Sequence, residues 1–153
     1  MVPFFVMLTS LLLFRGLGAV GVPALASWRA ATRAALTVLF LFTATAHFNP
    51  TKEDLIRMVP PSVRYARQVV FLTGLCEVFG ALGLVAPPVR RAAGIALVVF
   101  LVAVFPANIY AAQAEIALRG RPITPLRLRL PMQLLYIALT WWSTQTGLER
   151  QAP

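Results

Sequence analysis

Hydrophobic residues in this chain fall into five long runs, which are separated by connections rich in charged residues and proline. A helix that crosses a bilayer takes about 20 apolar residues, and proline disfavours the continuation of a helix beyond it. The pattern therefore predicts an all-helical polytopic membrane bundle. Its five predicted transmembrane spans cover residues 2–25, 34–48, 68–86, 92–112 and 131–146.

A shorter amphipathic segment follows the second run. Residues 51–58 mix apolar and charged side chains between two prolines, Pro50 and Pro60. The apolar side chains of such a helix can enter the boundary between lipid and water. We predict an interfacial helix here, within a single membrane domain that covers residues 1–153.

The N-terminal run has a second interpretation as a cleavable signal peptide, because it is followed by small residues that end in Ala24-Leu25-Ala26. However, no Lys or Arg precedes the run, and the tract between Arg15 and Ala26 is long for a cleavage region. We therefore favour a retained first span with Arg15 inside the bilayer.

Composition agrees with a membrane location. Of 153 residues, 59% are hydrophobic and 12% are charged, whereas about 25% are charged in soluble domains. The formal charge of +9 comes from Lys and Arg that lie mostly between the apolar runs, where they suit lipid headgroups better than nucleic acid. The lipid bilayer is thus the expected surrounding, and no nucleic-acid partner is expected.

Glu77 is the acid that lies inside a predicted span. By helical rise it is about 15 Å deep, close to the middle of a hydrocarbon core of about 30 Å. Gly74, Gly80 and Gly83 would let a neighbouring helix approach it. Ionisable groups at this depth are costly, so Glu77 is either part of a functional site or a structural tie.

Antiparallel threading gathers further polar residues near Glu77, because the second and fourth spans end on the side where the third and fifth begin. The residues placed there are His47, Thr73, Asn108, Tyr110, Gln113, Gln133 and Tyr136. Arg15 would reach a similar depth on the first span and is a candidate counter-ion for Glu77. The other half contains almost nothing polar, which predicts a pocket that opens to one side.

Several of these residues also have a purely structural interpretation. His47 lies near the end of its span and would serve there either as a ligand contact or as an interfacial cap. Pro106 should break the fourth span and free the carbonyl of Val102. Asn108 and Tyr110 would then act as hydrogen-bonding groups for that break.

The small number of histidine and cysteine residues, and the absence of known motifs, exclude several kinds of cofactor site and catalytic site. One histidine and one cysteine cannot form a zinc site, a bis-histidine haem site or an iron–sulfur site. The chain also lacks a dinucleotide fingerprint, a phosphate-binding loop and an evident nucleophile–base pair. No independent catalytic motif is found and no metal site is expected.

Four motifs, in this order, resemble the DoxX-like membrane proteins. They are His47-Phe48-x-Pro50, Asp54-Leu55-x-x-Met58-Val59-Pro60-Pro61, Thr73-Gly74-x-x-Glu77-x-x-Gly80-Ala81-x-Gly83-Leu84 and Phe105-Pro106-Ala107-Asn108-Ile109-Tyr110. The resemblance covers about residues 30–146 and implies a four-helix core with one added N-terminal span. It also implies a place beside redox proteins, since the founding member is named for a subunit of a thiosulfate:quinone oxidoreductase. The family pattern carries no established catalytic role.

We therefore predict a redox-associated subunit that binds a quinone-like or other small lipophilic ligand around Glu77. Glu77 and His47 would exchange protons or hydrogen bonds with an oxygen of the ligand, which Asn108 and Tyr110 would orient. Candidate aromatic walls are Phe71, Phe79 and Phe105. A quinone is the cofactor class in view, and electrons would come from a partner subunit, so the chain is at most part of a quinone-linked oxidoreductase complex.

Two other functions stay open. A non-catalytic assembly protein, in a complex or a homo-oligomer, would use Glu77 and Arg15 as a buried tie. A transporter of a small solute or of protons would need Gly80, Gly83 or Pro106 as flexible points. In each case we predict a multi-pass protein of the cell membrane. Lys and Arg are more numerous on the side of the pocket, so the positive-inside rule favours a cytoplasmic pocket mouth.

Overall fold

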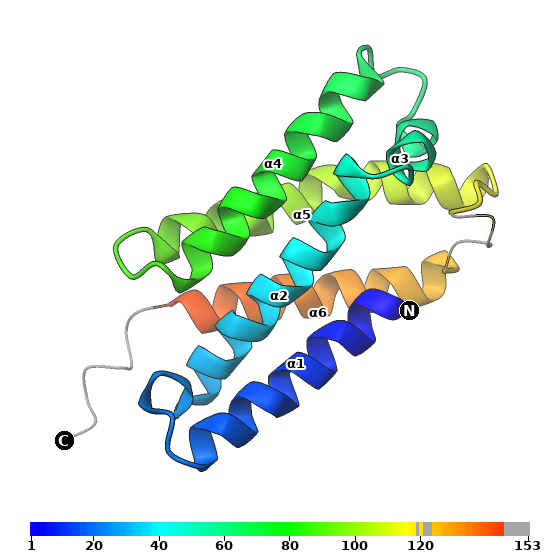
Figure 1. Cartoon of the computed structure of the whole chain (residues 1–153). Coiled ribbons are helices and arrows are strands. Elements are labelled where there is room, and N and C mark those ends of the chain that lie inside the picture. Colours follow the sequence, from blue (N-terminus) through cyan, green and yellow to red (C-terminus); the bar gives the residue numbers. More distant parts are fainter. Residues whose placement is uncertain (119, 121–123, 146–153) are drawn as a thin grey trace.

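The computed structural model describes residues 1–118, 120 and 124–145, which form six α-helices and one short 3-10 helix (Figure 1). The helices are α1 (Val2–Ala19), η1 (Pro23–Leu25), α2 (Trp28–Phe48), α3 (Lys52–Met58), α4 (Ala66–Val85), α5 (Arg90–Gln113) and α6 (Leu126–Thr144). No strand forms in this part of the chain. The all-helical prediction is confirmed for the described residues.

Four helices, α1, α2, α4 and α5, are long and apolar enough to cross a membrane. Their outward side chains are largely apolar, and large residues such as Phe79 and Val99 are more than half exposed. Helix α6 is less apolar, because its sequence includes Arg127, Arg129 and Gln133. A fifth span at α6 therefore stays a prediction.

Helices α2, α4, α5 and α6 form a four-helix bundle, in which contacts join α2 to α4, α4 to α5, α5 to α6 and α6 to α2. Helix α1 packs against α2, and α3 contacts α2, α4 and α5 at one end (Figure 1). We call this the Glu77 end: α2 and α5 finish there, and α4 and α6 begin. The opposite end is called the Arg33 end.

The core of the bundle is apolar at its centre and depends on small residues between α4 and α5. Leu36, Leu39, Leu84 and Leu97 are at most 1% exposed. A Cβ atom added at Gly80 would lie 2.5 Å from Cδ2 of Leu97. Since no real Cβ contact is that short, α4 could not lie so close to α5 with a larger residue here.

Helix boundaries near the N-terminus differ from the prediction. The first helix ends at Ala19 and not near residue 25, because the chain turns at Gly21, whose φ of +108° favours glycine. The second helix begins at Trp28 and not at residue 34, because the Ser27 hydroxyl accepts a hydrogen bond from the amide of Ala30 at 3.1 Å. Such an N-cap starts a helix before the sequence becomes apolar.

Two prolines lie inside helices that they were expected to bound or break. Helix α5 continues through Pro106 to Gln113, so the predicted break is wrong. Helix α6 begins at Leu126, directly after Pro125, and Pro131 lies within it instead of starting it. Proline removes one backbone donor, but neighbouring groups can keep such a helix intact. The short helix predicted at 51–58 is found as α3.

Candidate functional site

His47 and Glu77 meet where α2 packs against α4 near the Glu77 end. Nε2 of His47 lies 3.5 Å from Oε2 of Glu77, and Glu77 is 8% exposed. Thr43, one turn before His47 on α2, donates its hydroxyl to Oε1 of Glu77 at 3.2 Å. Residues four apart share one face of a helix, so α2 places Thr43 beside Oε1 and His47 beside Oε2. Thr43 was not predicted as a site residue, although its spacing from His47 was the available signal.

The imidazole of His47 is oriented by α4. Its Nδ1 lies 2.7 Å from the carbonyl oxygen of Val70 and 3.4 Å from the hydroxyl of Thr73. A carbonyl oxygen only accepts hydrogen bonds, so Nδ1 carries a proton and donates it to Val70. The predicted neighbour Thr73 thus joins the site beside His47, and its own hydroxyl also donates to Val70 at 2.9 Å.

This geometry lets His47 and Glu77 share one proton. The proton lies either on Glu77, which then donates to Nε2, or on Nε2, which then forms an imidazolium beside a carboxylate. The pair is neutral in both forms, and this reduces the cost of burying the acid. The separation of 3.5 Å is longer than an ordinary hydrogen bond, and Oε2 has no hydrogen-bond partner among the described residues. This oxygen is therefore a buried acceptor that lacks a donor among the described residues.

Gly74 makes the contact between the two helices close. A Cβ atom at this position would lie 2.6 Å from Cβ of His47 and 3.0 Å from Cζ of Phe48. Both distances are shorter than ordinary carbon–carbon contacts. The absence of a side chain at Gly74 therefore sets how near His47 comes to Glu77.

A hollow of about 260 Å³ opens beside His47, between the end of α2, the helix α3 and the start of α4. It is lined by His47, Phe48, Lys52, Ile56, Arg67, Val70 and Phe71. The rings of Phe48 and Phe71 meet edge to face, with 6.0 Å between their centroids. The lining of this hollow therefore combines two aromatic rings, two cationic side chains and the imidazole of His47.

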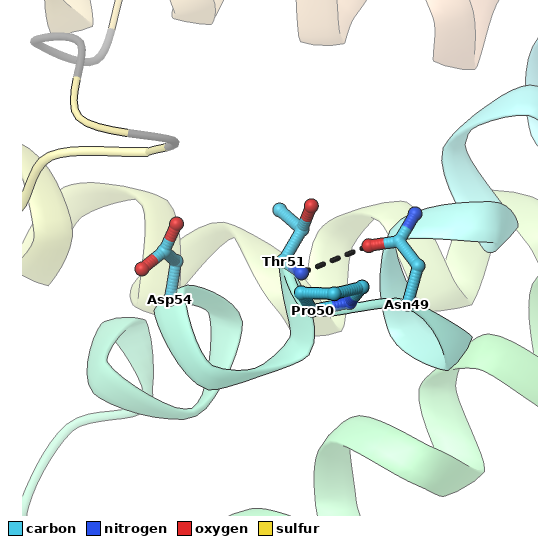
Figure 2. A pocket seen from close by; sticks show the side chains of 4 residues that line it. All are labelled: Asn49, Pro50, Thr51 and Asp54. Carbon is cyan, nitrogen blue, oxygen red and sulfur yellow. Dashed lines mark hydrogen bonds between the residues drawn. The ribbon is translucent and has the colours of Figure 1, made fainter.

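A second hollow, of about 470 Å³, lies at the turn between α2 and α3 and is lined by Asn49, Pro50, Thr51 and Asp54 (Figure 2). The side chain of Asn49 accepts a hydrogen bond from the amide of Thr51 at 2.8 Å, drawn as the dashed line. This bond fixes the turn into α3. The hollow was not predicted, and it does not include His47 or Glu77 in its lining.

A family model described as "Domain of unknown function (DUF8561)" matches residues 36–144. The chain belongs to the DUF8561 family. The match begins inside α2 and ends at the last residue of α6, so it covers most of the bundle, α3 and the pair of His47 and Glu77, but not α1. No curated protein and no solved structure matches the chain. The resemblance to DoxX-like proteins stays a prediction.

Other polar residues at the Glu77 end of the DUF8561 bundle lie between α5 and α6. Arg129 donates to Oδ1 of Asn108 at 2.6 Å, and Gln133 donates to the carbonyl of Leu101 at 2.5 Å. Pro106 has no amide hydrogen, so the carbonyl of Val102, four residues earlier, lacks its usual donor in the helix. Gln133 bonds to the neighbouring carbonyl of Leu101, so a polar side chain supplies a hydrogen-bond donor to this part of α5. No hydrogen bond or ion pair among the described residues joins Asn108, Gln133 or Tyr110 to the buried pair, and their ligand-orienting role stays a prediction.

The predicted aromatic walls are separated in the structure. Phe71 lines the 260 Å³ hollow. Phe79 is 67% exposed on the outer surface of α4, and Phe105 is not part of the lining. Phe48, which was not predicted, takes the second aromatic position.

The predicted pairing of Arg15 with Glu77 is wrong. The guanidinium of Arg15 lies over the ring of Trp28, 5.1 Å from its centroid. Trp28 starts α2, whereas Thr43 and His47 lie about 22 Å or more further along that helix by its rise. Because α1 ends at Ala19, Arg15 lies in its last turns at the Arg33 end. His47 and Thr43 take the place that the prediction gave to Arg15.

The Arg33 end also holds a buried polar cluster, which contradicts the prediction that this half contains almost nothing polar. Its members are at most 7% exposed: Thr32, Arg33, Thr140, Ser143 and Thr144. The guanidinium of Arg33 donates to the carbonyl of Ser143 at 2.7 Å, and Arg29 donates to that of Gln145 at 2.6 Å. The cluster could not be predicted from the hydrophobic pattern, because threonine and serine also occur within apolar runs.

Proposed function

We propose that this DUF8561 protein binds a small lipophilic ligand of quinone-like chemistry in the hollow beside His47. The observation that carries the proposal is the buried Oε2 of Glu77, which lacks a hydrogen-bond partner and lies 3.5 Å from Nε2 of His47. Buried polar atoms in proteins nearly always have partners. His47 lines the hollow and Glu77 does not, so in this proposal a ligand oxygen approaches the pair from the side of His47 and supplies the missing partner.

The shape and lining of the hollow support a ring-shaped head group. Its volume of about 260 Å³ is slightly below the range of about 300 to 1,000 Å³ for pockets that enclose a whole drug-sized ligand. A ring would fit there while an apolar tail stays in the lipid. Phe48 and Phe71 offer their edges and faces to such a ring.

The proton chemistry of the pair suits an oxygen that changes its protonation. A carbonyl oxygen would accept the proton that His47 and Glu77 share, and a hydroxyl group would return one to the pair. The sequence contains no redox cofactor motif, so in this proposal electrons come from a partner protein. The resemblance to DoxX-like proteins agrees with such a redox-associated subunit.

The proposed setting is the cell membrane, crossed five times, with α6 as the fifth span. The apolar outer surfaces of α1, α2, α4 and α5 support this setting. With the mouth of the hollow on the cytoplasmic side, the basic connections at the Glu77 end would satisfy the positive-inside rule.

Replacing Glu77 with glutamine is expected to weaken quinone binding by at least about tenfold, because a hydrogen bond to a charged or proton-sharing group contributes about 1.5 to 3 kcal/mol. Titration of a short-chain naphthoquinone into the purified protein in nanodiscs measures this. Glu115→Gln makes the same chemical change away from the hollow and should bind as the wild type does. Arg15→Gln should also leave binding unchanged, since Arg15 lies on Trp28.

Equal and negligible binding by the wild type and by Glu77→Gln would sink the proposal. A purely structural role for the pair predicts that Glu77→Gln lowers the melting temperature, with no ligand effect in either protein. A transport role predicts a different signal, which is solute uptake into vesicles that follows an imposed pH gradient. Ligand binding, a structural role and transport thus predict three different results in these experiments.

A further inference from the structure

Two cations line the hollow from different helices. Lys52 is the first residue of α3 and Arg67 is the second residue of α4, and both contribute to the lining beside Phe71. The lining contains no acidic side chain. His47 lies on the same lining and is neutral together with Glu77. The hollow is therefore apolar and neutral on the side of the buried pair, and cationic at Lys52 and Arg67.

The cation of Arg67 is held only weakly by the protein itself. Its Nη2 lies 3.5 Å from Oε2 of Glu53, and the two side chains are 71% and 54% exposed. Exposed ion pairs at such distances contribute little, with a median between about 0 and 1 kcal/mol. An incoming anion can therefore replace Glu53 at low cost.

The start of α4 adds partial positive charge to the same region. Its first turn contains no acidic residue, and its N-cap residue, Tyr65, makes no side-chain capping bond. Unpaired amide groups at the start of a helix favour a nearby anion. This dipole acts together with Arg67, which belongs to the same turn.

We propose that Lys52 and Arg67 bind an anionic group, a phosphate or a carboxylate, on the outer end of the ligand in this hollow. This inference rests on the proposed function in using the same hollow, and it narrows the ligand class to acidic amphiphiles. The apolar body of the ligand lies against Phe48 and Phe71. Arg67 on α4 offers a planar fork for two oxygen atoms, and Lys52 on α3 adds a point charge.

Three ten-carbon probes test the charge preference: decanol, decanoate and decyl phosphate, titrated into the full-length protein in nanodiscs of zwitterionic lipid. Both acids should bind more tightly than decanol. Lys52→Gln and Arg67→Gln should each weaken binding of the acids about fivefold, since a cation near a membrane surface contributes about that factor toward an anion. Binding of decanol should not change.

Two matched variants sharpen the test. Glu53→Gln removes the competing carboxylate and should strengthen binding of both acids. Arg64→Gln removes a cation from the same end of the bundle, but Arg64 is exposed and does not line the hollow, so binding should stay at the wild-type level. Unchanged affinity for the acids in both Lys52→Gln and Arg67→Gln, or decanol binding as tightly as decanoate, would overturn the inference.

A second arm separates the two sources of an anionic amphiphile. Phosphatidylglycerol added to the nanodiscs will displace decyl phosphate if the natural occupant is a membrane lipid, and will leave it bound if the occupant is a free acidic lipophile. Both outcomes uphold the anion site. Failure of the proposed function can be distinguished from failure of the anion site. If only the proposed function fails, Glu77→Gln will leave quinone titrations unchanged, while the preference for the two acids over decanol persists.

Discussion

A side chain at position 74 is expected to disrupt the candidate site and to destabilise the whole bundle. Gly74→Val places a Cβ atom where Cβ of His47 lies 2.6 Å away and Cζ of Phe48 lies 3.0 Å away. Both neighbours belong to α2, and the Cβ of His47 cannot move without its backbone. We expect α2 and α4 to separate, at a cost of about 3 kcal/mol, as for severe overpacking. The increase of the distance between His47 and Glu77 should abolish ligand binding as well.

Thermal unfolding in detergent or nanodiscs measures the first effect, and quinone titration measures the second. Gly16→Val is the matched control, because a Cβ atom there would meet nothing within 4 Å. It shares with Gly74→Val the intrinsic effect of replacing glycine by valine inside a helix. Equal shifts in melting temperature for the two variants would contradict a special role for the close approach at Gly74.

The placement of His47 and Glu77 in the same half of the bundle could be predicted from the sequence because it depends on few assumptions, whereas their direct contact was not predicted. Consecutive helices in a membrane alternate in direction, so the end of one span and the start of the next lie on the same side. The spacing of each residue from the nearest polar boundary then fixes its depth. Both residues are rare types for such a position, and this made them visible.

Contacts that depend on the rotation of a helix about its axis could not be predicted in the same way. Threading gives depth but not which face of a helix points inward, so Asn108 and Gln133 were expected beside Glu77 and instead lie in the contact between α5 and α6. Thr43 was overlooked for the same reason. Its hydroxyl also bonds to backbone carbonyl groups of its own helix, the usual behaviour of threonine in an apolar helix.

The position of Arg15 was predicted wrongly because an apolar run does not reveal where a helix ends. The run continues past Ala19 through Val20 and Val22, but the helix stops where Gly21 adopts a positive φ. The run 2–25 therefore folds as one helix and a turn. Arg15 then lies near the end of α1 and reaches Trp28 across that turn.

At the Arg33 end of the bundle, the largest loss of stability is expected from removing the guanidinium of Arg33. Arg33 is 7% exposed and donates to the carbonyl of Ser143 at 2.7 Å, in the last turn of α6, where carbonyl groups lack partners within the helix. A cation there also opposes the negative end of the helix dipole. Arg33→Leu should therefore lower the free energy of unfolding by about 2 kcal/mol, as when a buried carbonyl group loses its donor.

Chemical denaturation of the purified variants measures this loss. Arg33→Lys keeps the charge but not the planar fork, so it should fall between Arg33→Leu and the wild type. Arg91→Leu removes an exposed arginine at the same end and should stay within about 0.5 kcal/mol of the wild type. If Arg33→Leu were no less stable than Arg91→Leu, the carbonyl groups at the end of α6 would not need Arg33. Since α6 reaches the Glu77 end through Gln133 and Arg129, a loosened α6 should also weaken ligand binding, whereas Arg91→Leu should not.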